Sequence, residues 1–73
     1  MKWQAALDTK FFEIVKTPFY NPDGSFYSFH YYIFAYKDSK CTHIYLQESF
    51  KLALLCALKD LAVPKEAWIK VKN

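Results

Sequence analysis

The sequence predicts one α+β domain over residues 1–73: an antiparallel β-meander of three or four strands, packed on one face by a single α-helix and followed by a short C-terminal strand. Three observations predict this fold class. Asn21-Pro22-Asp23-Gly24 has the composition of a tight turn between two strands. Runs of aromatic and β-branched residues flank this turn. A run of good helix formers follows Ser49 and stops at Pro64.

The strands follow from the β-rich runs and from the turn signals between them. Phe11 to Phe19 forms the first run, and Ser25 to Lys37 forms a longer second one. Asp38-Ser39-Lys40 is a second turn signal, after which Cys41 to Gln47 is predicted as a third strand. Met1 to Asp8 fits either an edge strand or a short helix.

The C-terminal third contains the predicted helix and the last strand. Ser49 is the expected N-cap of a helix over Phe50 to Ala62, because a serine side chain can accept a hydrogen bond from the first free backbone N–H groups. Ala67 to Lys72 alternates between apolar and polar residues, so we expect a short strand there. Helical spacing gives the helix a core face of Phe50, Ala53, Leu54, Ala57, Leu58 and Leu61.

The composition favours a binding protein. The chain is 53% hydrophobic and 21% aromatic. A 73-residue domain has a thin core, so we expect another protein or a second copy of the chain to cover part of this aromatic surface. The net charge of +3 comes from lysine without any arginine, and lysine lacks the rigid fork that reads guanine or clamps phosphate.

The chain is expected to be cytoplasmic, with no membrane partner. Its longest apolar stretch, Leu52 to Leu58, is far shorter than the roughly 18–20 residues that cross a bilayer. Met1 to Asp8 lacks the unbroken apolar run of a secretory signal. Cys41 and Cys56 are therefore expected to be two buried free thiols.

A register set by the two turns sorts the strand residues onto two faces. It pairs Tyr20 with Phe26, Val15 with Tyr31, Tyr36 with Cys41, and Ile33 with Ile44. One face is mostly aliphatic and is expected to receive the helix: Val15, Phe29, Tyr31, Ile33, Ala35, Ile44 and Leu46. The other face is mostly aromatic: Phe12, Ile14, Lys16, His30, Tyr32, Phe34, Tyr36, His43 and Tyr45.

The aromatic face is the predicted binding site, because one helix covers one side of a sheet. Tyrosine and histidine tolerate water and still offer a large, rigid contact area. The predicted partner-binding residues are Phe12, Tyr32, Phe34, Tyr36, Tyr45, His30 and His43, with Lys16, Lys37 and Lys40 beside them. In the alternative interpretation, residues 1–8 and Trp68 close this face as a second core layer.

The sequence predicts a non-enzymatic protein without a metal or cofactor. His30 and His43 are expected roughly 13 Å apart along the strands, too far to share a proton. Cys41 and His43 are expected on one face, without a glycine-rich turn or helix N-terminus to activate the thiol. A zinc site needs about four convergent ligands. One glycine cannot build a phosphate-binding loop.

Another protein is the predicted partner, bound through the aromatic face or through an exposed sheet edge. Pairing with a second copy is an alternative use of the same surface. The second alternative is single-stranded RNA or DNA, in which bases stack on aromatic rings and lysines hold the phosphates. Its platform would be Phe12, Tyr32, Phe34 and Tyr45, with Lys16, Lys37, Lys40, Lys70 and Lys72 around it. The modest charge and the absence of arginine favour a protein partner.

The order of three antiparallel strands, a helix and a short last strand resembles the antitoxin fold of the HicB kind and the small arm-binding domains of phage integrases. The likeness covers about residues 11 to 72, including the helix-opening stretch Gln47-Glu48-Ser49-Phe50. The glycine-rich first hairpin expected of the antitoxins is absent from this chain. In size and style the chain is also similar to phage-encoded inhibitors of host defence, including anti-CRISPR proteins. That similarity implies a small inhibitor or adaptor that acts on a host defence complex.

Overall fold

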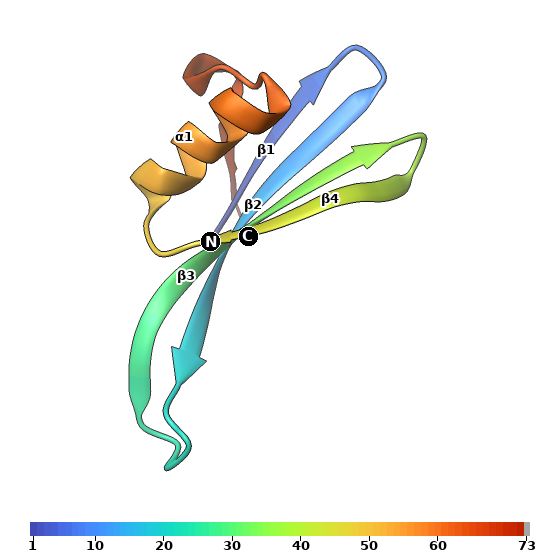
Figure 1. Cartoon of the computed structure of the whole chain (residues 1–73). Coiled ribbons are helices and arrows are strands. Elements are labelled where there is room, and N and C mark those ends of the chain that lie inside the picture. Colours follow the sequence, from blue (N-terminus) through green and yellow to red (C-terminus); the bar gives the residue numbers. More distant parts are fainter. Residues whose placement is uncertain (73) are drawn as a thin grey trace.

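A computed structural model describes residues 1–72 and confirms the α+β fold class. Within these residues a five-stranded antiparallel sheet has one α-helix packed on it (Figure 1). The strands are β1 (Lys2–Leu7), β2 (Lys10–Tyr20), β3 (Phe26–Lys37), β4 (Lys40–Gln47) and β5 (Ile69–Val71); the helix is α1 (Phe50–Leu61), followed by a 3₁₀ turn at Lys65–Ala67. The strand order is β4-β3-β2-β1-β5.

Residues 1–8, for which the sequence left two interpretations open, contain strand β1. This strand pairs with β2 from Lys2 opposite Val15 to Leu7 opposite Lys10, and its other side pairs with β5. Its side chains Trp3 and Leu7 pack on the core beneath α1. The first residues therefore extend the sheet sideways, and the alternative in which they close its second face is wrong.

The turns form where the sequence places them. Asp38 and Ser39 both have positive φ, 51° and 66°, which is the backbone of a two-residue type I′ hairpin turn. Gly24 lies at φ 90°, a region where a side chain would be strained. The tight turns keep β1 to β4 adjacent in chain order, so the meander follows directly from the local sequence.

Helix α1 begins and ends close to its expected bounds. The Ser49 hydroxyl accepts a hydrogen bond from the Leu52 N–H at 3.1 Å, which confirms Ser49 as the N-cap. The helix ends at Leu61, and Ala62 takes a left-handed conformation. The expected core face is partly wrong, because Leu58 is exposed and Cys56 is buried. Among residues 1–72 no helix combines the length and the apolar character needed to cross a membrane.

The core lies between α1 and one face of the sheet. Ile14 and Ile33 are fully buried against Ala53 and Cys56. Alanines mark the close approach of helix and sheet: Ala5, Ala35, Ala53 and Ala57 are all buried. Because an alanine side chain is short, the helix can lie directly on the strands at these positions.

The expected register is wrong over most of the sheet because two β-bulges shift it by one residue. Tyr20 does lie opposite Phe26, but the pairing then shifts between Phe19 and Tyr20, and Val15 lies opposite Tyr32. Tyr36 does lie opposite Cys41, but the pairing shifts between Ala35 and Tyr36. The pairings skip Tyr27 and Thr42, which are the extra residues of the two bulges.

A one-residue shift moves every side chain of a strand to the other face. The residues of β3 keep their expected faces, whereas those of β2 and β4 exchange theirs. The face beneath α1 holds Phe12, Ile14, Lys16, Phe29, Tyr31, Ile33, Ala35, His43 and Tyr45. The opposite face, here called the open face, holds Val15, His30, Tyr32, Phe34, Tyr36, Ile44 and Leu46. Within residues 1–72 no other element packs over the open face (Figure 1).

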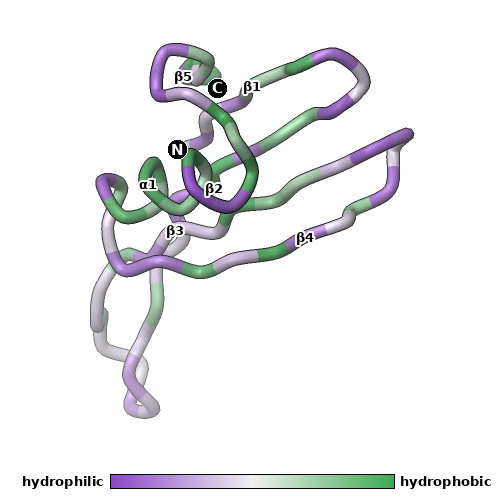
Figure 2. Tube along the Cα trace, turned by 45° about the horizontal axis from the view of Figure 1, so that its top comes forward, coloured by the Kyte–Doolittle hydropathy of each residue, from purple (hydrophilic) through white to green (hydrophobic). Residues whose placement is uncertain are grey.

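The β2–β3 hairpin projects beyond the rest of the sheet. Pairing with β1 stops at Val15 and pairing with β4 stops at Tyr31, so residues 17–30 form a two-stranded extension. We call this extension the arm; Figures 1 and 2 show it pointing away from α1. The structure is accordingly elongated, with principal dimensions of 44 × 25 × 23 Å.

Candidate protein-binding surface

A connected row of aromatic rings crosses the open face from one end of the sheet to the arm. Neighbouring ring centroids are separated by 6.1 Å (Phe11–Tyr36), 6.4 Å (Tyr36–Phe34), 5.7 Å (Phe34–Tyr32), 6.2 Å (Tyr32–Phe19), 4.6 Å (Phe19–His30) and 6.3 Å (His30–Tyr27). These separations lie within the range of favourable ring contacts. We call this row the aromatic ladder.

The pleat of the sheet explains how the sequence builds the ladder. Tyr32, Phe34 and Tyr36 alternate along β3, so their rings stand side by side on one face. Phe11 and Phe19 of β2 lie near the two ends of that row. The ladder therefore depends on two adjacent strands, β2 and β3, and not on loops.

Aliphatic side chains and shallow hollows border the ladder. Ile44 and Leu46 of β4 lie beside it and are 60% and 46% exposed. One hollow, of about 280 Å³, is lined by Phe19, Tyr20, Tyr27, His30 and Leu46. A second, of about 420 Å³ at the other end, is lined by Thr9, Phe11, Glu13, Tyr36, Asp38 and Ser39. The open face thus has two shallow, open depressions beside the ladder.

The arm exposes large rings without a core of its own. Tyr20 and Tyr27 are 62% and 65% exposed, and Phe26 and Phe29 are also exposed. A two-stranded hairpin alone is marginally stable in water. In Figure 2 the arm is mostly pale while α1 is mostly green, because tyrosine, which combines an apolar ring with a polar group, has an intermediate hydropathy. Such rings suit a surface that alternates between water and a partner.

Hydrogen bonds order the tip of the arm. The Asn21 N–H donates to the Ser25 carbonyl at 2.8 Å, and the Gly24 N–H donates to the Asn21 carbonyl at 2.9 Å. The Asp23 carboxylate accepts from the Ser25 N–H at 2.9 Å. Hydrogen bonds from the Ser25 hydroxyl and N–H lower the pKa of Asp23 below its ordinary value. The tip of the arm, residues 21–25, is therefore ordered by its own hydrogen bonds, which reduces the entropy that the tip loses on binding.

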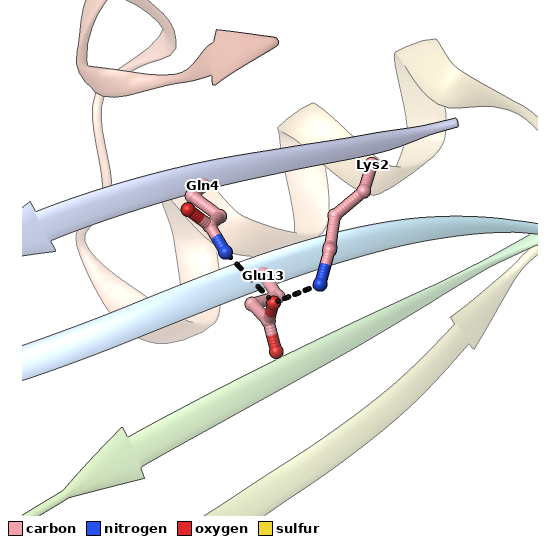
Figure 3. Close-up of polar contacts among 3 residues, drawn as sticks. All are labelled: Lys2, Gln4 and Glu13. Carbon is pink, nitrogen blue, oxygen red and sulfur yellow. Dashed lines mark hydrogen bonds and ion pairs between the residues drawn. The ribbon is translucent and has the colours of Figure 1, made fainter. Parts of the chain in front are cut away.

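Lys2 and Glu13 form an ion pair on the open face, so their opposite charges cancel. The Lys2 ammonium is 3.1 Å from a Glu13 carboxylate oxygen, and the Gln4 amide donates to the same oxygen at 3.1 Å (Figure 3). Burial alone would raise the pKa of Glu13, but hydrogen bonds from Gln4 and Lys2 outweigh it and keep that pKa below 4.5. Burial and the neighbouring Glu13 carboxylate raise the pKa of Tyr36. The surface thus combines aromatic rings with a compensated ion pair.

The Glu13 interaction predicts a pH-dependent contribution to stability. A carboxylate with a lowered folded-state pKa stabilises the protein fully above its unfolded pKa, near 4.5, and loses this effect as pH falls through the folded value. We expect Glu13→Gln to lower the free energy of unfolding at pH 7 by about 1 kcal/mol or less. Its difference from the wild type should shrink below about pH 4.5. Urea unfolding between pH 7 and pH 3 measures this, with Glu66→Gln as the exposed control; a difference that is constant with pH would contradict it.

Several lysines project from the helix side of the sheet. Lys10 lies directly opposite Lys37, which lies directly opposite Lys40. This row shares its face with Phe12 and Ala35, beneath α1. Lys16 is on the same face, with its ammonium 4.2 Å from the centroid of the Phe29 ring. These lysines therefore do not surround the aromatic ladder.

The structure separates the predicted binding residues into two groups. His30, Tyr32, Phe34 and Tyr36 lie together in the aromatic ladder. The others, Phe12, Tyr45, His43, Lys16, Lys37 and Lys40, belong to the helix side of the sheet. Phe12 is 2% exposed and is a core residue. Tyr45 packs against the core beneath α1, and His43 stacks on it at 6.1 Å. The register shift in β2 and β4 explains why the first four of these six residues lie on the helix side.

The sequence interpretation missed Phe11, Phe19, Tyr27, Ile44 and Leu46. A signal was present in the hydrophobic pattern. Pairing Ile14 with Ile33, and large Phe12 with small Ala35, gives the observed β2–β3 register and buries the aliphatic residues together. That choice would have placed Phe11 and Phe19 on the open face. The bulges themselves carry no recognisable sequence signature.

The histidines and thiols do not converge. His30 and His43, expected on one face, lie on opposite faces of the sheet. The bulge at Thr42 also separates Cys41, opposite Tyr36, from His43, opposite Ala35. Within residues 1–72 no three His, Cys, Asp or Glu side chains lie close enough together to hold a metal ion.

The two thiols are free and differ in exposure, which corrects the expectation that both are buried. Cys56 is buried in the helix–sheet interface, whereas Cys41 is exposed on edge strand β4. Burial raises the pKa of the Cys56 thiol, and the Asp60 carboxylate adds to the effect. We therefore expect a thiol reagent to label Cys41 rapidly and Cys56 after denaturant unfolds the chain. Mass spectrometry of Cys41→Ser and Cys56→Ala variants assigns the two phases; rapid labelling of Cys41→Ser would contradict the burial of Cys56.

Comparisons with known proteins leave the site to be interpreted from its own geometry. No protein-family model matches the chain, and neither the curated proteins nor the solved structures give a match.

Proposed function

We propose that this chain is a non-enzymatic protein-binding module, a small inhibitor or adaptor that binds its partner through the arm and the aromatic ladder. The observation that carries this proposal is a continuous surface of rings that extends from the open face onto an ordered projection. Rigid aromatic side chains dominate binding energy at protein interfaces because they bury large area at little entropic cost. The narrower expectation, a phage-type inhibitor of a host defence complex such as an anti-CRISPR, stays a prediction.

The charge distribution favours a protein over a nucleic acid. Single-strand binding requires lysines beside the stacking platform, where they can hold phosphates. Lys16, Lys37 and Lys40 lie on the face beneath α1, opposite the ladder. The charge on the open face is the Lys2–Glu13 pair, which is already compensated. A partner with a mixed polar and apolar surface fits this arrangement.

Affinity capture from cells that encode the protein tests the proposal. The wild type is compared with a variant carrying Tyr20→Thr and Tyr27→Thr, which removes two rings of one hollow while keeping strand-compatible side chains. A matched control carries Leu55→Gln and Leu58→Gln, which removes two exposed leucines of α1. We expect one protein to be captured by the wild type and the control, and to be lost with the arm variant. Capture that survives the arm variant would contradict the proposal.

Direct measurement of oligonucleotide binding distinguishes a nucleic-acid partner from a protein partner. Binding of single-stranded RNA and DNA oligonucleotides is measured at about 50 mM and about 200 mM salt, a range over which phosphate contacts lose affinity steeply. We expect no salt-dependent binding. If binding depends steeply on salt and is lost in the arm variant, the partner is a nucleic acid and the proposal of a protein partner is wrong.

A further inference from the structure

A hollow lies between the C-terminal end of α1 and the end of the sheet that carries the β1–β2 and β3–β4 turns (Figure 1). Its volume is about 420 Å³, which is within the range of small-molecule sites. The buried side chains Phe12 and Ala35 lie at its base. Three lysines from three elements line it: Lys10 of β2, Lys37 of β3 and Lys59 of α1. We call this hollow the lysine pocket.

The strand lysines of the pocket belong to a row of like charges. Lys10 lies directly opposite Lys37, and Lys37 lies directly opposite Lys40, so the three side chains share one face of the sheet. Like charges directly opposite each other destabilise a sheet. Within residues 1–72 no carboxylate forms an ion pair with these lysines; the ion pair there joins Lys2 and Glu13 on the other face. Lys37 is therefore repelled from both sides without compensation.

The pocket keeps an excess of positive charge that suits an anion. Lys59 adds a third ammonium group from the last turn of α1, and one carboxylate, that of Asp60, also lines the pocket. About two positive charges thus remain uncompensated in it. A phosphate monoester carries about −1.5 to −2 at pH 7, and lysine binds phosphate as a point charge. We propose that the lysine pocket binds the phosphate group of a small phosphomonoester.

The pocket itself indicates where the two parts of such a ligand lie. The last carbonyls of α1 carry partial negative charge, so the phosphate is expected nearer to Lys10 and Lys37 than to the helix end. Leu61 and Ala62 line the helix side of the pocket and offer apolar contact to the organic part. Inorganic phosphate lacks that part, and the phosphodiester of a nucleic-acid strand carries one charge per phosphate. A terminal phosphate on a small organic molecule therefore matches the pocket best.

Two-dimensional NMR of the isotope-labelled protein tests the site at constant ionic strength, because salt screens exposed charges. The probes are AMP, adenosine and inorganic phosphate. We expect AMP to shift the backbone amides of Lys10, Lys37 and Ala62 saturably, with a dissociation constant of about 1 mM or lower. Adenosine should leave them in place, and inorganic phosphate should bind more weakly than AMP. The proposal is wrong if AMP gives no saturable shift, or if either other probe binds as tightly.

A fourth probe separates the phosphomonoester from a nucleic-acid strand. An oligothymidylate of about eight nucleotides without a terminal phosphate is within the length that single-strand sites hold. We expect it to leave the amides of the pocket in place. Binding at these amides that is tighter than that of AMP would make the pocket a nucleic-acid contact and overturn the proposal.

Lys37→Gln distinguishes a ligand-binding lysine from a structural one. The change removes the repulsion on both sides of position 37, so it should raise the urea midpoint of unfolding while it weakens AMP binding about tenfold. Lys70→Gln is the matched control, because Lys70 is an exposed strand lysine that lies opposite Trp3. It should leave AMP binding unchanged. A Lys37→Gln variant that binds AMP as tightly as the wild type, or that loses binding together with stability, would refute the site.

This site goes beyond the proposed function and uses neither the arm nor the aromatic ladder. The pocket lies on the helix side of the sheet, so a protein partner on the open face leaves it accessible. Lys37→Gln should therefore still capture the protein partner, and the variant with Tyr20→Thr and Tyr27→Thr should still bind AMP. Failure of the phosphate site and failure of the proposed function thus give different results.

Discussion

Replacing Phe12 with alanine is expected to lower the free energy of unfolding by about 3–5 kcal/mol. Phe12 is 2% exposed and packs with Ala5, Ala35 and Ala57 beneath α1, so truncation leaves a cavity that these short side chains cannot fill. The total free energy of unfolding of a 73-residue domain is about 4–11 kcal/mol. We therefore expect partial or complete unfolding at 37 °C, measured by urea titration followed by circular dichroism.

Phe34→Ala is the matched control, with the same change of side chain on the other face. Phe34 is half-buried in the aromatic ladder, and its loss should cost about 1 kcal/mol of ring contacts. The two variants also separate two interpretations of the site, since the sequence predicted both residues as partner-binding. Equal destabilisation by both variants would contradict the assignment of the open face.

The second large effect concerns binding. Once the captured partner is purified, Tyr20→Thr with Tyr27→Thr is expected to weaken its binding by at least about 30-fold, because truncating even one anchoring aromatic residue costs about 2 kcal/mol and effects at one site are not additive. Tyr20 and Tyr27 line one hollow of the arm, so both changes remove the same anchor site. Isothermal titration calorimetry measures the change in the dissociation constant.

The free energy of unfolding of the arm variant distinguishes a binding role of these rings from a structural one. Tyr20 and Tyr27 are 62% and 65% exposed, so their replacement should change the free energy of unfolding by about 1 kcal/mol or less. The Leu55→Gln and Leu58→Gln control should bind the partner as the wild type does. Lost binding together with an unfolded arm variant would mean that the rings hold the hairpin together and are no evidence for an interface.

Local sequence signals were sufficient for most of the fold. The turn at Asn21-Pro22-Asp23-Gly24 and the cap at Ser49 depend on interactions within a few residues, and both formed as predicted. The sequence leaves β1 open between strand and helix, because the two residues that join it to β2, Asp8 and Thr9, include neither glycine nor proline, and its other partner, β5, lies at the far end of the chain. Its pairing with β5 depends on a contact between the two ends of the described chain, for which the local sequence carries little information.

The candidate site was harder to predict because it depends on register. The residues of β3 alternate so strongly that Tyr32, Phe34 and Tyr36 were placed correctly on one face. The bulged residues Tyr27 and Thr42 then reversed the faces of β2 and β4. A bulge is a compromise between twist and pairing over the whole sheet, so counting from the turns cannot find it.

Site-specific photocrosslinking in cells tests the central claim most directly. A photoreactive phenylalanine analogue is placed at Tyr27 in the arm, at Phe34 in the ladder, or at Leu58 on the outer side of α1. If the ring surface is the interface, positions 27 and 34 should crosslink to the same protein and position 58 should not. Crosslinks from position 58 alone, or none from positions 27 and 34, would contradict it.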